Sequence, residues 1–273
     1  MPREMKIPDQ KLSEFQPGSI DYTDLSLEEL YQLEGDEARE ALWQIRLATV
    51  KCQKCWLFNK NEELHFIGDD CVDDGYGLPV SGVGSHTAGL MIIGEAPGKD
   101  EVYQGKPFVG RAGALLREAI AESGLDANEV YISNVIHCRP PNNKFPDANI
   151  DEVKETVQVC RPWLFKEIAI IKPFVILGCG SKPLRHIAKS KGKITETAGK
   201  KRQITFGGFG HSCYYMATLH PSFCLRPGRD FHLPDDLLAD WQKVASLSPS
   251  QKQDLLKEHL YEAARLAYDF EDE

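Results

Sequence analysis

The sequence has no apolar run long enough to cross a membrane. No stretch approaches the ~20 consecutive apolar residues that a membrane-spanning helix needs, and the opening residues, MPREMKIPDQ, lack the apolar core of a secretory signal. We therefore expect a soluble, intracellular protein without a membrane partner. With 273 residues and 42% hydrophobic composition, the chain is long enough to bury one sizeable core.

Cysteine is also scarce. Eight cysteines in 273 residues are too few for a disulfide-bonded scaffold, and a reducing cytoplasm would keep them as thiols. Two of them, Cys52 and Cys55, form a Cys-x-x-Cys pair, a spacing that suits metal ions and clusters. Ligation of a metal or cluster is therefore the first role to consider for the cysteines.

A net positive charge, which is common in proteins that bind nucleic acid, is missing as well. The formal net charge is −9, but the excess of acids is confined to the two ends. Residues 1–50 hold 5 Lys/Arg against 11 Asp/Glu, and residues 231–273 hold 4 against 10. The region between them carries a net charge of +3.

Basic side chains are concentrated in residues 181–202, which contain eight of them and one acid, Glu196. Such a cluster suits a phosphate backbone, although an ordinary solvated helix and loop explains it equally well. The eight are Lys182, Arg185, Lys189, Lys191, Lys193, Lys200, Lys201 and Arg202.

Apolar runs and helical patterns alternate along the middle of the chain. The runs predict buried parallel strands at 90–94, 130–135, 173–177 and 213–219, with an antiparallel partner at 203–206. Helices are predicted at 26–33, 36–50, 110–123, 150–171 and 181–189. This alternation indicates an α/β fold, a three-layer α/β/α sandwich with a central, mostly parallel four-stranded sheet and helical terminal extensions.

We expect three parts in the chain: an acidic N-terminal extension over 1–35, a main domain over 36–245 and a C-terminal amphipathic helix over 246–273. Ligands of parallel sheets bind beyond the carboxyl ends of the strands. Glu95, Asn134 and His220 each follow a predicted strand. They should therefore face a single crevice.

Two loops rich in small residues follow the first predicted strand. The turn Gly94 to Gly98 lets the backbone approach a ligand closely. The second loop, Gly105 to Gly113, presents one aromatic residue, Phe108, which suits stacking on a flat base, although a lone Phe is more often part of the core.

Four motifs make the comparison with a known family specific. GEAPG (94–98), GKPFVGRAG (105–113), SNVIHCRPP (133–141) and LHPSFCLR (219–226) resemble, in order and approximate spacing, the family 4 uracil-DNA glycosylases, which carry a [4Fe–4S] cluster. The resemblance runs from about Cys52 to Arg226. It implies an intracellular, cytoplasmic or nucleoid-associated enzyme that hydrolyses the N-glycosidic bond of deoxyuridine in DNA.

The resemblance also implies roles for residues of the crevice. Asn134 matches the residue whose amide reads the edge of uracil, and Phe108 matches the ring that stacks on the base. His220 would donate a hydrogen bond to uracil O2, and Glu95 would orient the attacking water. Glu101 matches an acid near the uracil C5 edge that helps to refuse thymine, although Val102 stands where the family commonly has Asp.

The remaining site predictions concern the rims of the crevice. Gly94 and Ala96 are expected to line the base pocket. Beyond His220, either Leu225 or Phe223 would enter the DNA groove, unless both are plain core residues. The predicted DNA contacts are Ser222, Leu225, Arg226, Lys182 and Lys200.

By the same resemblance, Cys52, Cys55, Cys138 and Cys160 would hold a structural [4Fe–4S] cluster. Zinc would accept the same four ligands and stays open as an alternative. The segment of 21 residues between the last two cysteines is longer than the family usually has, so Cys71 is a substitute for Cys160.

Two other functions stay open from the sequence. The chain could act on another modified pyrimidine, or it could be a binding module for uracil or DNA without catalysis. In the second case the acidic ends would be docking segments for a protein partner.

Overall fold

The computed structural model describes residues 20–58, 79–126, 129–143, 145, 151–229 and 240–268. The strands are β1 (Leu90–Gly94), β2 (Val130–Asn134), β3 (Val175–Cys179), β4 (Lys201–Thr205) and β5 (Ser212–Thr218). The helices of six residues or more are α1 (Leu27–Gln32), α2 (Gly35–Val50), α4 (Lys99–Gln104), α5 (Arg111–Glu122), α6 (Asp151–Ile171), α7 (Ser181–His186), α10 (Asp240–Ser246) and α11 (Pro249–Tyr268). Shorter ones are α8 (Ile194–Thr197), α9 (Pro221–Cys224) and the 3₁₀ turn η3 (Pro141–Asn143).

The strands form one sheet in the order β2-β1-β3-β5-β4. The first four are parallel, and β4 pairs antiparallel with β5 at the edge. The predicted α/β class and mostly parallel sheet are confirmed, but the count of four strands is wrong. The segment expected only as a partner of the last strand is a full fifth strand, because it closes a hairpin whose side chains alternate in exposure.

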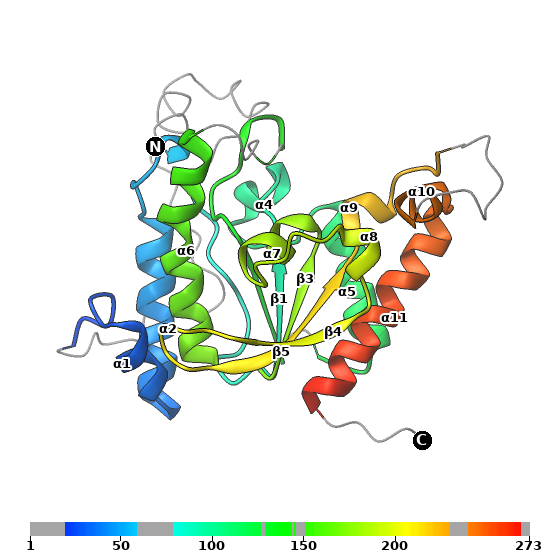
Figure 1. The fold of residues 1–273 in the computed structure, drawn as a ribbon. Coiled ribbons are helices and arrows are strands. Elements are labelled where there is room, and N and C mark those ends of the chain that lie inside the picture. The colour runs from blue at the N-terminus through cyan, green and yellow to red at the C-terminus, as the bar shows by residue number, and fades with distance from the viewer. Residues whose placement is uncertain are drawn as a thin grey trace.

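Helices cover both faces of the sheet, as the three-layer prediction requires (Figure 1). Helices α1, α2 and α6 pack together on one side, while α5 and α11 pack together on the other. The side chains of β1 alternate accordingly. Met91 and Ile93 join the core under α2 and α6, whereas Leu90 and Ile92 join the core under α5 and α11.

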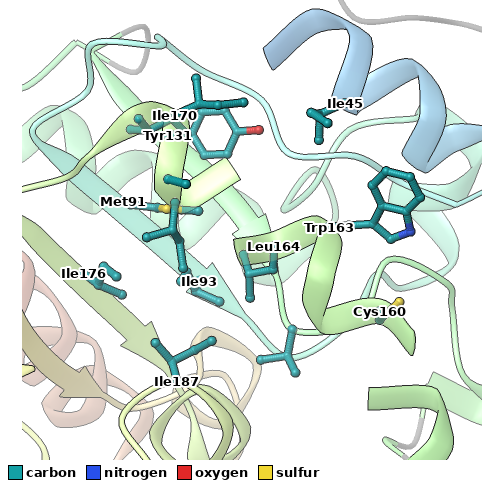
Figure 2. Packing of buried hydrophobic residues seen from close by; sticks show 14 of the residues in the cluster. Ile45, Met91, Ile93, Tyr131, Cys160, Trp163, Leu164, Ile170, Ile176 and Ile187 are labelled. Atoms are coloured by element: carbon teal, nitrogen blue, oxygen red, sulfur yellow. The ribbon is translucent and has the colours of Figure 1, made fainter. Parts of the chain in front are cut away.

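The core under α2 and α6 is the larger of the two and is almost entirely aliphatic and aromatic. Figure 2 shows Met91 of β1 beside Tyr131 and Ile93 beside Leu164 of α6, with Trp163 farther along α6 near Cys160. This packing fixes the positions of β1 and β2 relative to α6. It therefore also fixes the positions of the residues at the carboxyl ends of these strands.

Several elements differ in detail from the prediction. The capping box at Ser26 and Glu29 is present, with both of its hydrogen bonds. Helices α4, α8, α9 and α10 were not predicted, because each has seven residues or fewer, too few to show a period, and unlike α1 none was recognised from a capping box at its start. No described helix combines the length and apolar character needed to cross a bilayer.

Candidate active site

The carboxyl ends of the parallel strands open onto a cavity of about 440 Å³. Glu95, Asn134 and His220 all line it, so the three strand ends do converge as expected. Figure 1 shows α4, α7 and α9 gathered at this end of the sheet. The other lining residues are Ala96, Pro97, Gly98, Lys99, Asp100, Glu101, Phe108, Gly110, Arg111, Ala112, Asn143, Phe145, Ser222, Phe223 and Arg226.

Asn134, the last residue of β2, is the polar group at the floor of the cavity. Its side chain is 2% exposed, and its Oδ1 packs against Gly94 at the end of the neighbouring strand. No described residue forms a hydrogen bond with its amide, although buried amides normally have partners. The amide is therefore available to a bound molecule.

Phe108 closes the same corner of the cavity. Its backbone has a φ of 52°, which is rare for a residue with a side chain, and its carbonyl is held by Arg117 Nε at 3.2 Å. The ring packs against Gly94, and its centroid lies 6.1 Å from that of His220. A strained backbone conformation that is held by a side chain of another element is typical of a residue positioned for a ligand.

Glu101 organises the two small-residue loops. Its Oε2 accepts from the N–H of Gly98 at 2.9 Å, and its Oε1 accepts from the N–H groups of Val109 and Gly110, both at 2.9 Å. The carboxylate thus ties the turn after β1 to the loop that carries Phe108. It lines the cavity, but its oxygens are already engaged, so its visible function is to hold these loops together.

Glu95 is anchored at the first turn of α7. Its Oε1 accepts from the backbone N–H groups of Ser181 at 3.1 Å and Lys182 at 3.3 Å. Gly180 has a φ of 97°, and a side chain there would meet the carboxylate. This turn holds Glu95 at the wall of the cavity and leaves its Oε2 for a ligand or water.

His220 has a defined tautomer. Its Nδ1 accepts from the backbone N–H of Ser222 at 3.2 Å and lies 2.8 Å from the Ser222 hydroxyl. Burial lowers the pKa of His220, although the Glu95 carboxylate opposes this. The imidazole is therefore neutral near pH 7, with its hydrogen on Nε2.

The other predicted DNA contacts are spread over a wider surface. Arg226 is exposed and lines the cavity, while Leu225 packs partly against the small core of Leu115, Leu219 and Leu256. Lys200 is exposed before β4, away from the cavity lining.

Lys182 lies close to the cavity. Its Nζ is 4.8 Å from the ring centroid of Phe145, which lines the cavity and stacks on His186. Sequence reasoning missed several lining residues, above all Arg111, Asn143 and Phe145. Arg111 lies inside a quoted motif, whereas Asn143 and Phe145 belong to the long segment before Cys160 and had no pattern to mark them.

The four predicted cysteine ligands come from three elements that meet beside this site. Cys52 and Cys55 follow α2, Cys138 follows β2, and Cys160 lies on α6. Contact with the Cys138 thiol lowers the pKa of Cys55 to about 6, and Cys138 also interacts with Cys160 and Cys52. Among the described residues, no three Cys, His, Asp or Glu side chains surround a point as ligands of one metal ion would.

The thiols nevertheless suit a cluster in kind and place. A cubane spreads its ligands over several iron atoms, so its thiolates need only gather and not meet at one point. The alternative ligand Cys71 lies outside the described residues. Burial raises the pKa of Cys160 to about 12, as expected of a thiol that ionises only when an iron or other cation replaces its proton.

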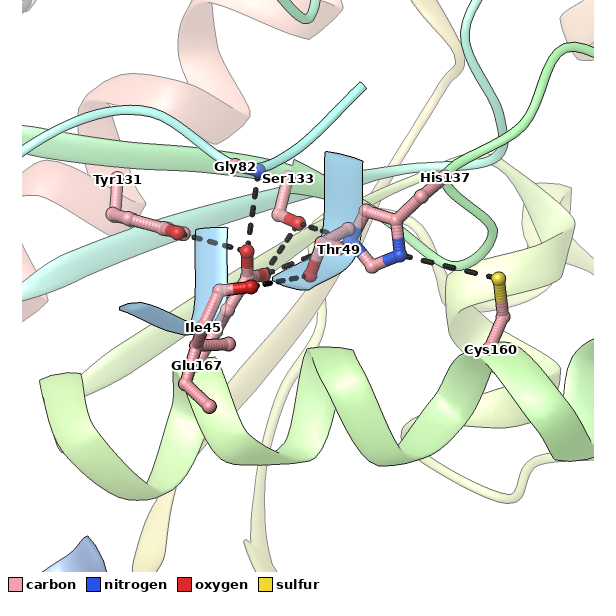
Figure 3. Close-up of polar contacts among 8 residues, drawn as sticks. All are labelled: Ile45, Thr49, Gly82, Tyr131, Ser133, His137, Cys160 and Glu167. Carbon is pink, nitrogen blue, oxygen red and sulfur yellow. Dashed lines mark hydrogen bonds and ion pairs between the residues drawn. The ribbon is translucent and has the colours of Figure 1, made fainter. Parts of the chain in front are cut away.

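A buried polar network joins Cys160 to β2 (Figure 3). Glu167 of α6 is fully buried and accepts from Ser133 Oγ at 2.6 Å, Tyr131 OH at 2.9 Å and the N–H of Gly82 at 3.1 Å. On the other side of Ser133 lies His137, whose Nδ1 is 4.0 Å from Cys160 Sγ. The segment that carries Asn134 is therefore fixed to α6.

Comparisons with known proteins agree with this geometry. Residues 81–245 match the family profile described as "Uracil DNA glycosylase superfamily". A type-4 uracil-DNA glycosylase of Saccharolobus solfataricus is 36% identical over 180 residues, which are 64% of this chain and 73% of the relative. Type-4 uracil-DNA glycosylases of Archaeoglobus fulgidus (35%, 66% of this chain, 87% of the relative) and Sulfurisphaera tokodaii (34%, 78% and 88%) are also similar.

The matched segment contains every strand of the sheet and the whole lining of the cavity. The chain therefore belongs to the uracil DNA glycosylase superfamily.

Proposed function

We propose that this protein is a monofunctional uracil-DNA glycosylase of base excision repair. It would hydrolyse the N-glycosidic bond of deoxyuridine in DNA, releasing uracil and leaving an abasic site. The observation that carries the proposal is the convergence of Glu95, Asn134 and His220 on one cavity. The names of the relatives, type-4 uracil-DNA glycosylases, support it.

Recognition would begin with a nucleotide turned out of the DNA stack, at a cost of a few kcal/mol. Uracil would then stack on Phe108, with Gly94 and Ala96 beneath it. The Asn134 amide would donate to uracil O4 and accept from N3–H. Cytosine has the opposite donor and acceptor pattern at these atoms, so the same amide would reject it.

During the reaction, charge would develop on the base and on the sugar, and groups of the pocket would stabilise both. The C1′–N1 bond breaks with both electrons leaving on the base, so uracil becomes an anion and the sugar gains oxocarbenium character. His220 would donate its Nε2–H to O2 of the anion. Glu95 Oε2 would orient the water whose oxygen bonds to C1′ and whose proton is released.

Cys52, Cys55, Cys138 and Cys160 would hold the [4Fe–4S] cluster. When bound, the cluster would supply a cross-link between α6, the end of α2 and the loop after β2, since hydrolysis requires no electron. The acidic ends remain predicted docking segments for a protein partner, and Lys182, Lys200, Ser222, Leu225 and Arg226 remain the predicted DNA contacts.

The test is a base-release assay with anaerobically purified protein on single- and double-stranded oligonucleotides. Wild type should release uracil without added metal or cofactor, whereas Glu95→Gln and Asn134→Ala should be slower by 10²-fold or more. Glu37→Gln, which removes an exposed carboxylate on α2, is the control and should match wild type. Release of hypoxanthine or a 5-modified uracil in preference to uracil would assign a different substrate.

A further inference from the structure

The C-terminal helix α11 buries a lysine. Lys252 is 0% exposed, and burial lowers the pKa of its ammonium group. Burying an ammonium group is costly unless its hydrogen bonds are replaced. Replacing a buried charge by an apolar side chain of similar size is often neutral or stabilising. Stability alone therefore does not account for a lysine at this position.

The contacts of Lys252 are with the segment that follows His220. Its Nζ donates to the carbonyl of Arg226 at 3.3 Å and that of Pro227 at 3.5 Å, and lies 4.7 Å from the ring centroid of Phe223. We call residues 223–227 the rim loop. Lys252 thus touches the rim loop at three points.

The rim loop forms one edge of the active-site cavity. Phe223 and Arg226 both line the cavity, and Arg226 is exposed. The loop's start is held by the bond from Phe223 N–H to the His220 carbonyl, 2.8 Å. Its far end is held by α10, since Arg229 N–H donates to the Ala245 carbonyl at 3.0 Å. Between these two anchors, Leu225 packs against Leu115 and Leu256, and Lys252 donates hydrogen bonds to the backbone carbonyls of Arg226 and Pro227.

We propose that Lys252 is a positioning residue for substrate DNA. Acting through the rim loop, it holds Phe223 and the Arg226 guanidinium where they engage the strand beside the extruded nucleotide. This inference rests on the proposed function and deepens it, because it makes α11 part of the DNA-binding apparatus. Lys252 itself is too buried to reach a phosphate.

The experiment compares Lys252→Met with Lys257→Met in the full-length protein. Lys257 lies on the same helix and pairs with Glu118 and Glu122, away from the rim loop. Lys252→Met should raise KM for a uracil-containing oligonucleotide about tenfold, or about 1.4 kcal/mol, with kcat within about twofold and an unchanged melting temperature. Lys257→Met should leave KM unchanged, and Lys252→Arg should restore much of the affinity.

Two further measurements separate positioning from a general structural effect. Amide hydrogen exchange should become faster at Phe223, Arg226 and Arg229 in Lys252→Met and stay unchanged elsewhere. In a double-mutant cycle with Arg226→Ala, the loss of affinity from Lys252→Met should shrink, because Arg226 is already absent.

An unchanged KM together with unchanged exchange in the rim loop would overturn the inference. So would full additivity in the double-mutant cycle. Failure of the proposed function looks different. In that case wild type would release no uracil, while hydrogen exchange, measured on the protein alone, would still report whether Lys252 holds the loop.

Discussion

The lack of a side chain at Gly94, the last residue of β1, determines the shape of the base pocket. Gly94 sits between the Asn134 amide and the Phe108 ring, and a Cβ added there would overlap both. Asn134 and Phe108 could be identified from their motif positions. The reason for glycine at 94 required the packing of two strand ends and a loop.

Gly94→Ala should therefore displace Asn134 or Phe108 by a few tenths of an ångström or more. We expect uracil release to slow by roughly 10²-fold, the usual effect of a small misplacement in an active site. Gly207→Ala is the matched control, because a Cβ there meets nothing within 4 Å. Equal rates for the two variants would contradict the role assigned to Gly94.

Glu167 is a second single residue whose side chain should have a large effect, in this case on the free energy of unfolding. Glu167→Ala would leave Tyr131 OH, Ser133 Oγ and the Gly82 N–H without their acceptor. We expect the free energy of unfolding to fall by roughly 3 kcal/mol, because three buried donors would lose their hydrogen-bond acceptor. Urea denaturation measures this. A loss below about 0.5 kcal/mol, the level of an ordinary surface substitution, would show that the network is dispensable.

At the scale of elements, the strands and long helices were predictable from pattern, whereas four of the helices of seven residues or fewer, α4, α8, α9 and α10, were not. Apolar runs marked β1, β2, β3 and β5, because parallel strands covered on both faces have few polar positions. The edge strand β4 was predicted at 203–206 as an antiparallel partner, but it begins at Lys201, because its exposed face carries polar residues that hide its first positions. Helix α9 has four residues, and only His220-Pro221 at its start marks it.

The elements that bear cysteines provide a test of the cluster. Cys160→Ala should lose iron and visible absorption in anaerobically purified protein, because α6 then offers no thiolate at the site. Cys213→Ala is the control, since Cys213 is also buried and burial also raises its pKa to about 12, but it lies on β5. Zinc in place of iron in wild type would assign the alternative metal.

At the scale of the whole molecule, several histidines are buried or half-buried in their neutral form. Burial lowers the pKa of His211 and His259, and lowers that of His186 to about 4. Between the folded pKa and about 6.5, the unfolded chain binds protons that the folded protein does not. Stability should therefore be fully present above about pH 6.5 and decline as the pH falls below it.

Melting temperatures measured from pH 8 to pH 4 check this decline. The variant His186→Gln should lose less stability than wild type between about pH 6.5 and pH 4. It removes an imidazole that takes up a proton in the unfolded chain over this pH range but whose pKa in the folded protein is about 4. Identical pH profiles would mean that His186 does not contribute.

The sequence by itself determined the fold class, the order of the elements and the identities of the groups at the strand ends. These follow from local pattern and from the rule that parallel strands present their carboxyl ends together. Only the tertiary structure decided that Glu101 binds two loops, that Glu167 joins α6 to β2, and that Lys252 supports the rim loop. Each of these side chains acts on segments distant in the chain, and such a contact leaves no periodicity in the sequence.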